Sequence, residues 1–149
     1  MSPRLNPYKA APEAMKASVA LENYVRQSGL DHSLIDLVNT RPSQINGCAL
    51  LHPYDYERGA RAARPRSAFI CSMHGMNRRS TANASLAWTE VETLVSETHI
   101  PDVVYDQARQ HFSETELVNL TLFVTAINPW NRIATSFRAA HPTRWKAGT

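Results

Sequence analysis

The stretch Ser113-Glu-Thr-Glu-Leu-Val-Asn-Leu120 decides the fold, because it joins the start signal of a helix to the apolar period of one. Ser at the N-cap with Glu three residues later forms a capping box, in which each side chain accepts a hydrogen bond from the other residue's backbone N–H. Beyond it, apolar side chains recur at helical spacing: Leu117, Leu120, Val124, Ile127, Trp130, Ile133 and Phe137. We therefore predict one long helix from Ser113 to Phe137, with a kink at Pro129.

The same helical period fills the first third of the chain. Residues 11–28 carry apolar side chains at helical spacing, and Gly29 then supplies a stop signal. A second helix is expected from Ser33, where Ser33-Leu-Ile-Asp36 forms a capping box with Asp in the place of Glu. Pro42 is expected to bend or interrupt this helix, and Asn-Gly at positions 46 and 47 then marks a turn.

The second half of the chain is also helical in its pattern. Leu86-Ala-Trp-Thr-Glu-Val-Glu-Thr-Leu-Val-Ser-Glu97 is amphipathic, and Ile100-Pro101-Asp102 opens a shorter helix with Pro in its first turn. Residues 53–85 show neither a helical nor a strand period, and the polar tail from 141 to 149 is expected to be frayed. The sequence therefore predicts an all-α fold in a single domain over residues 1–149, with an irregular central segment.

Composition limits the kinds of protein that this chain can be. Apolar residues make up 43% of it, and no run approaches the roughly 18 apolar residues of a membrane span. The N-terminus lacks the apolar core of a secretory signal, so we expect a cytoplasmic location and no membrane partner. Cys48 and Cys71 are too few for a disulfide scaffold. Cys71 and His74 have the spacing of half a zinc site, but two ligands are too few, so neither a metal nor a cofactor is predicted.

Positive charge is concentrated in the central segment. Residues 49–85 hold six Arg against Asp55 and Glu57, a net charge of +4, whereas the rest of the chain holds ten Lys or Arg and eleven Asp or Glu, a net charge of −1. A basic patch can bind nucleic acid. This one has no helical face and no interleaved aromatic residues, so no nucleic-acid partner is predicted.

Three strings of sequence carry a family resemblance, and they occur in the family's order. The first is Ser43-Gln-Ile-Asn-Gly-Cys48, and the second is Leu86-Ala-Trp-Thr-Glu90. The third is Phe112-Ser-Glu-Thr-Glu-Leu-Val-Asn-Leu120, followed by Ile127-Asn-Pro-Trp-Asn-Arg-Ile133. On these strings the chain resembles the alkylhydroperoxidase D / carboxymuconolactone decarboxylase family. The resemblance implies an all-α fold that assembles as a homo-oligomer, either a trimer or a hexamer.

The resemblance also implies a chemistry based on two cysteines. Active members of the family carry Cys-x-x-Cys followed by His, with a Glu twelve residues before the first Cys; the second Cys attacks the hydroperoxide and the first resolves the sulfenic acid as a disulfide. By this match Cys48 stands at the position of the resolving Cys, and Asp36 at that of the Glu. Leu51 stands where the peroxidatic Cys belongs and Asp55 where the His belongs. Leucine cannot form a sulfenic acid, so the implied cycle is broken.

Each candidate residue also has an ordinary structural interpretation. A lone thiol such as Cys48 is commonly a small buried side chain. Asp36 can serve as the capping partner of Ser33. Trp88 and Trp130 are expected to be packing residues or subunit contacts. The polar residues of the third string are expected to make structural hydrogen bonds and interface contacts: Asn128, Asn131 and Arg132.

The functional prediction combines these points. The chain is expected to be a thiol-dependent alkyl hydroperoxide reductase-like antioxidant protein with peroxiredoxin-type chemistry, inactive as written because the second Cys and the His are missing. Active relatives would use a hydroperoxide as substrate and a dithiol as reductant. Two alternatives stay open: a carboxymuconolactone decarboxylase-like enzyme and a non-catalytic oligomeric remnant.

The genetic code offers an explanation for the irregular centre. Met73-His-Gly-Met-Asn77 has nearly forced codons, and reading them from the third base yields Ala, then Trp or Arg, then one of four residues, then Glu, as in the family's own helix. Leu50-Leu-His-Pro-Tyr54 read from the second base permits Tyr-Cys-Ile-His-Met, which restores a cysteine three residues after Cys48 but not the motif His. We therefore hypothesise that residues from about 49 to 85 are translated out of frame; true divergence is the alternative.

Overall fold

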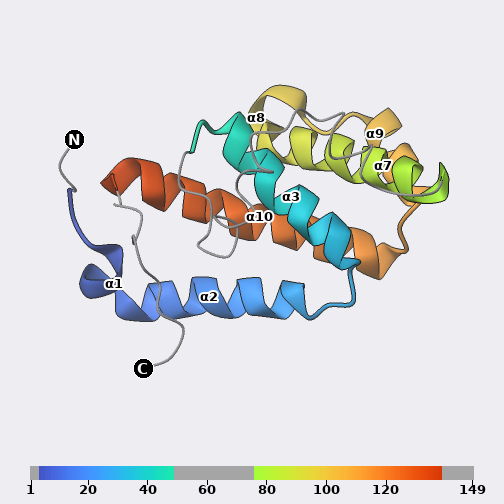
Figure 1. Cartoon of the computed structure of the whole chain (residues 1–149). Coiled ribbons are helices and arrows are strands. Elements are labelled where there is room, and N and C mark those ends of the chain that lie inside the picture. Colours follow the sequence, from blue (N-terminus) through green and yellow to red (C-terminus); the bar gives the residue numbers. More distant parts are fainter. Residues whose placement is uncertain (1–3, 49–75, 139–149) are drawn as a thin grey trace.

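The computed structural model describes residues 4–48 and 76–138, and every regular element within those two ranges is an α-helix (Figure 1). The predicted all-α fold is therefore confirmed. The helices are α1 (Pro7–Ala10), α2 (Pro12–Arg26), α3 (His32–Ile45), α7 (Met76–Thr93), α8 (Val95–Thr98), α9 (Asp102–Arg109) and α10 (Glu114–Phe137). None of these described helices is long and apolar enough to cross a membrane.

The longest helix, α10, is the one on which the others are arranged. The helix α2 lies along one side of it, while α3 and α7 pack on its other side and against each other (Figure 1). The short helix α9 packs mainly on α7. The apolar period predicted for α10 is confirmed, because four of its members are buried: Leu117, Leu120, Val124 and Ile127.

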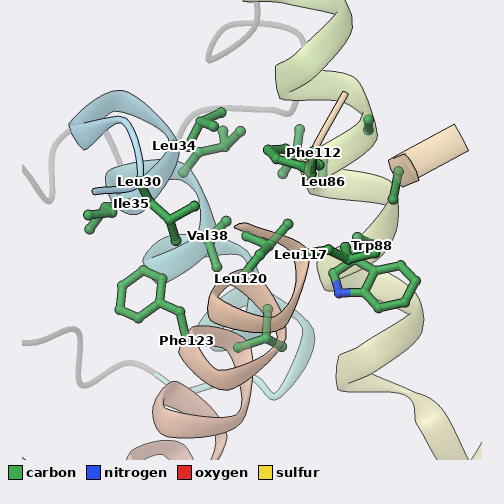
Figure 2. Close-up of a cluster of buried hydrophobic side chains, with 14 of the residues drawn as sticks. Leu30, Leu34, Ile35, Val38, Leu86, Trp88, Phe112, Leu117, Leu120 and Phe123 are labelled. Atoms are coloured by element: carbon green, nitrogen blue, oxygen red, sulfur yellow. The ribbon is translucent and has the colours of Figure 1, made fainter. Parts of the chain in front are cut away.

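The hydrophobic core lies where α3, α7 and α10 meet (Figure 2). All three helices contribute buried apolar side chains to it, among them Leu34, Val38, Leu86, Trp88, Leu120 and Phe123. Fully burying one such side chain contributes about 1.5–3 kcal/mol. This cluster therefore supplies most of the energy that holds the helices together.

The start of α3 differs from the prediction. Its N-cap is Asp31, whose carboxylate accepts hydrogen bonds from the backbone N–H of Ser33 at 2.8 Å and from the Ser33 hydroxyl at 2.6 Å. The predicted capping box between Ser33 and Asp36 is therefore wrong. Asp is as good an N-cap as Ser. Asp31 lies two residues before Ser33, so it caps the free N–H groups at the start of the helix. Asp36 then falls inside the helix.

Two prolines lie inside helices without ending them. The helix α3 continues through Pro42 to Ile45, so it is not interrupted there, and the predicted bend stays a prediction. The helix α10 likewise continues through Pro129. Proline removes one backbone hydrogen bond from a helix. Tertiary packing offsets this loss in α3, since Pro42 is fully buried.

The helix α7 begins at Met76, although the sequence pattern predicted irregular structure up to residue 85. Ala82, Ala84 and Ser85 are buried in the core region. These small residues add little hydropathy, so the apolar period is invisible before Leu86. The rest of the predicted irregular segment, residues 49–75, lies outside the described residues, as does the tail from 139.

The predicted helix from Leu86 to Glu97 is divided in two. The Thr98 hydroxyl donates hydrogen bonds to the carbonyls of Val91 and Leu94, at 2.8 and 3.2 Å, and this folds the turn of α8 back on the end of α7. Two consecutive residues then adopt left-handed backbone: His99 with φ of 51° and Ile100 with φ of 49°. That conformation is unfavourable for residues other than glycine, and most of all for β-branched ones.

The N-terminal segment is fastened to the far end of α10. The backbone N–H of Arg4 donates to the carbonyl of Phe137 at 2.9 Å, and its guanidinium donates to the carbonyl of Ser136 at 3.0 Å. The last carbonyls of a helix have no partner within the helix, and a cation complements their partial negative charge. Arg4 therefore acts as a cap for α10.

The predicted start of α10 is confirmed. The N–H of Glu116 donates to the Ser113 hydroxyl at 3.2 Å, and the N–H of Ser113 donates to the Glu116 carboxylate at 2.8 Å. These hydrogen bonds from Ser113 hold the pKa of Glu116 below its ordinary value of 4.5. The helix that carries the core thus begins with both elements of its capping box in place.

Breaking this capping box should destabilise the protein in a pH-dependent way. We expect Ser113→Ala to lower the free energy of unfolding by about 1 kcal/mol at neutral pH. Because the folded-state pKa of Glu116 is lowered, its contribution is complete above its ordinary pKa and is lost as the pH falls through the lowered value. Urea unfolding of the parent and of Glu116→Gln should therefore differ at neutral pH and converge in acid.

The control for this experiment is Glu114→Gln, which changes the same exposed first turn of α10 without touching the capping box. A difference between the parent and Glu116→Gln that stayed constant into the acid range would contradict the expectation.

Candidate functional site

Cys48 is positioned by the way in which α3 ends. Gly47 adopts left-handed backbone with φ of 61°, which glycine accepts without strain. The N–H of Cys48 then donates to the carbonyl of Ser43 at 2.9 Å, and the N–H of Gly47 donates to the carbonyl of Gln44 at 3.2 Å. These are the two bonds of a Schellman motif, which pairs carbonyls that a helix end would otherwise leave free. The first of the three strings is therefore a helix-ending motif, and it confirms the predicted Asn-Gly turn.

The thiol of Cys48 is buried, with 9% of the residue exposed, and it is not part of a disulfide. A thiol placed there is shielded from solvent by the surrounding chain. Burial agrees with the ordinary interpretation of Cys48 as a small packing residue. The special feature of the position is the backbone geometry that holds it.

Two asparagines of α10 bind the last turn of α3. The Ser43 hydroxyl donates to Oδ1 of Asn131 at 3.0 Å, and Nδ2 of Asn46 donates to Oδ1 of Asn128 at 2.9 Å. Nδ2 of Asn128 donates in turn to the carbonyl of Val124 at 3.1 Å, which fixes the orientation of its amide. The expectation that Asn128 and Asn131 make structural hydrogen bonds is confirmed.

The amide of Asn131 is not fully satisfied. Asn131 is 3% exposed, and its Nδ2 has no hydrogen-bond partner among residues 4–48 and 76–138. If the amide were turned over, Nδ2 would donate to Ser43 and Oδ1 would be left without a donor, so one amide atom is unpaired in either orientation. A buried unpaired polar group costs about 1–3 kcal/mol. Asn131 is therefore a poor choice for stability alone.

An ion pair joins the same region of α3 to α7. Nε of Arg41 lies 2.9 Å from a carboxylate oxygen of Glu90, and a terminal guanidinium nitrogen of Arg41 donates to the side-chain oxygen of Gln44 at 3.1 Å. Both charged side chains are about two-thirds to three-quarters buried, with exposed fractions of 31% and 25%. Glu90 belongs to the second string, so all three strings meet around the end of α3.

Asp36 lies in the second turn of α3 and is half-buried. Asp36, Thr40 and Ser43 are spaced so that they share one stripe of the helix. The Thr40 hydroxyl donates to the Asp36 carbonyl at 3.0 Å, and both Thr40 and Ser43 are buried. Seven residues separate Asp36 from Ser43, which is about 10 Å along a helix axis. The relay role of Asp36 stays a prediction.

Several residues named from the sequence lie outside the described residues. Leu51 and Asp55, which stand at the peroxidatic and His positions, belong to residues 49–75. Cys71 and His74 lie in the same range. In the described part of the chain, no three His, Cys, Asp or Glu side chains gather in a way that could hold a metal ion.

The predicted packing roles of the tryptophans are visible in the structure. Trp88 is buried, and its indole N–H donates to the Thr121 hydroxyl at 3.0 Å. Trp130 stacks on Tyr8 with ring centroids 6.4 Å apart. Burial and the charge of Glu22 raise the pKa of Tyr8. These contacts tie α7 and α1 to α10.

Sequence reasoning missed the roles of Ser43, Asn46 and Arg41 as partners of other helices. The available signal was weak: Ser43 lies in a mostly polar part of α3, and its burial depends on a partner far along the chain.

Comparison with known proteins places the chain in a family. No protein-family model matches it. It is 34% identical over 141 residues to the uncharacterized protein YdfG of Bacillus subtilis, and the match covers 90% of this chain and 93% of that protein. A crystal structure from Agrobacterium tumefaciens, of a protein of unknown function described as a candidate antioxidant defence protein AhpD, is 38% identical with a TM-score of 0.79. That match covers 96% of this chain and 100% of the other. The chain belongs to the AhpD-like family.

The AhpD-like assignment agrees with the resemblance inferred from the three strings. The match to the solved structure runs across nearly the whole chain, so it includes the helices on both sides of residues 49–75. The decarboxylase side of the resemblance stays a prediction.

The ion pair of this AhpD-like site should contribute measurably to stability. We expect Arg41→Met to lower the free energy of unfolding by about 1–3 kcal/mol, because it leaves the partly buried Glu90 carboxylate without its cation. The matched control is Lys16→Met, which breaks the Lys16–Glu13 pair, whose side chains are 73% and 81% exposed. That change should cost about 0.5 kcal/mol or less. Equal effects of the two substitutions in urea unfolding would show that the Arg41 pair has no special weight.

Proposed function

We propose that this chain descends from thiol-dependent alkyl hydroperoxide reductases with an antioxidant role, that Cys48 occupies the resolving position, and that the reductase cycle does not turn over in the sequence as written. The observation that carries the proposal is the anchored Schellman turn at Cys48. This turn fixes the backbone of Cys48. A defined backbone suits a cysteine that must meet a partner sulfur, because disulfide geometry is narrow.

The proposed cycle has two thiol steps. A peroxidatic thiolate attacks the hydroperoxide, which releases an alcohol and leaves a sulfenic acid on the protein. A resolving thiol then attacks that sulfur, which releases water and forms a disulfide that an external dithiol reduces. Cys48 supplies only the second step. With Leu51 at the peroxidatic position, no sulfenic acid forms for Cys48 to attack.

The surroundings of Cys48 favour the resolving role over the peroxidatic one. A peroxidatic thiol is stabilised as a thiolate by a helix N-terminus or a nearby cation. Cys48 instead follows the C-terminal end of α3, where the helix dipole is negative. In α3, Arg41 is already bonded to Glu90 and Gln44.

The proposal includes a homo-oligomer, either a trimer or a hexamer, in the cytoplasm. Several large apolar side chains of the described residues are exposed: Leu5, Tyr8, Val19, Tyr24, Val95, Val103, Tyr105 and Val118. Where such side chains are contiguous they can form an association surface. Sedimentation velocity tests the assembly.

A peroxide assay tests the proposed loss of turnover. We expect the chain to consume an organic hydroperoxide with a dithiol at the rate of Cys48→Ser, because no peroxidatic thiol is present. Multiple turnovers that disappear in Cys48→Ser would contradict the loss of activity. Carbon dioxide release from a carboxymuconolactone that persists in Cys48→Ser would instead support the decarboxylase alternative. An oligomer with neither activity agrees with the remnant alternative.

The coding DNA tests the origin of the central segment. We propose that residues from 49 onward are out of frame, and the buried Ala82 and Ala84 of α7 lead us to place the return to frame before residue 82. Resequencing should then reveal compensating insertions or deletions between codons 48 and 82. The codons permit the repaired chain a cysteine three residues after Cys48, although they do not restore the motif His. Any hydroperoxide turnover that the repaired chain regains should therefore be lost in Cys48→Ser. A confirmed reading frame with the sequence unchanged would favour true divergence.

A further inference from the structure

We propose that Asn128 and Asn131 of α10 are positioning residues for Cys48. They fix the last turn of α3, and through it they set the placement and accessibility of the thiol. The inference deepens the proposed function and takes from it the resolving role of Cys48. The effect of the two asparagines on the position of Cys48 depends only on contacts between described residues.

Both asparagines act on residues that belong to the Schellman turn. Asn131 holds the side chain of Ser43, whose own carbonyl accepts the N–H of Cys48. Asn128 holds the side chain of Asn46, the C-cap residue that precedes Gly47. Asn131 is therefore linked to the backbone of Cys48 through Ser43 and one further hydrogen bond. Asn128 is linked to it through Asn46, which only Gly47 separates from Cys48.

The two asparagines are arranged to act together. They are three residues apart on α10, so their side chains lie on the same face of the helix. Asn128 also bonds to the carbonyl of Val124, and this holds its acceptor toward Asn46. Among the described residues one amide atom of Asn131 stays unpaired, so its bond to Ser43 is retained at a cost in stability. The arrangement is better explained by placement of the α3 terminus than by stability.

The labelling rate of the Cys48 thiol tests this role without any peroxide chemistry. The protein carries Cys71→Ser, so that Cys48 is the only thiol of the sequence. Labelling by an aromatic disulfide is followed under conditions where every variant is folded. We expect Asn128→Leu and Asn131→Leu each to raise the rate about fivefold or more, because the released turn opens more often.

The matched control is Thr121→Val. It also removes a hydrogen bond between α10 and another helix, the one from the Trp88 indole, but at a position seven residues, or about 10 Å of helix, before Asn128. Its labelling rate should stay within about twofold of the parent rate. Equal rates for all variants, or an equal increase in Thr121→Val, would overturn the proposal. If Asn131→Leu does not fold, Asn131→Ser is read by the same criteria.

A double-mutant cycle tests the route of the effect. If Asn128 acts through Asn46, then Asn46→Ala combined with Asn128→Leu should label no faster than the faster single variant. The pair Ser43→Ala and Asn131→Leu is expected to behave in the same way. If the increases in labelling rate of the two single variants multiplied in the double variant, the proposed route would be contradicted. Failure of the resolving role would appear separately, as hydroperoxide turnover of the repaired chain that survives Cys48→Ser.

Discussion

The structure depends on one constraint: the polar side chains of Ser43, Asn128 and Asn131, buried between α3 and α10, need hydrogen-bond partners across the interface. Apolar contacts are non-directional and allow two helices to slide or rotate against each other. The bonds from Ser43 to Asn131 and from Asn46 to Asn128 remove that freedom. With α3 fixed on α10, Arg41 faces Glu90 and sets the position of α7 as well. The apolar core supplies the energy, and this small polar network selects the arrangement.

The helices that could be predicted from the sequence are those with local signals. The start of α10 is determined by Ser113 and Glu116 alone, and both are close together in the chain. The start of α3 was missed because Asp31 competes with Ser33 for the same N–H groups, and a sequence pattern does not rank two adequate caps. The start of α7 was missed because Ala82, Ala84 and Ser85 are small, and their burial depends on neighbours from other helices.

The candidate site shows the same division. The position of Cys48 and its Asn-Gly turn could be predicted, since a left-handed glycine after a helix is a local event. The partners of Ser43 and Asn46 lie 88 and 82 residues away in sequence, so no local pattern identifies them. The three strings contain the residues that make these distant contacts, so they identify the family, but they do not show which residues are paired. The pairing is seen only in the folded structure, where the strings meet around the end of α3.

The connection between α8 and α9 has a consequence for anyone who wishes to engineer this protein. His99 and Ile100 both hold left-handed backbone, which costs about 1–2 kcal/mol for each residue. The partial packing of Ile100 against the core compensates for part of that cost. The core between the helices is already filled by buried side chains, whereas the loop from α8 to α9 holds unfavourable backbone conformations that a substitution can relieve. Thermal stability is therefore more easily gained by replacing His99 with asparagine or glycine than by repacking the core.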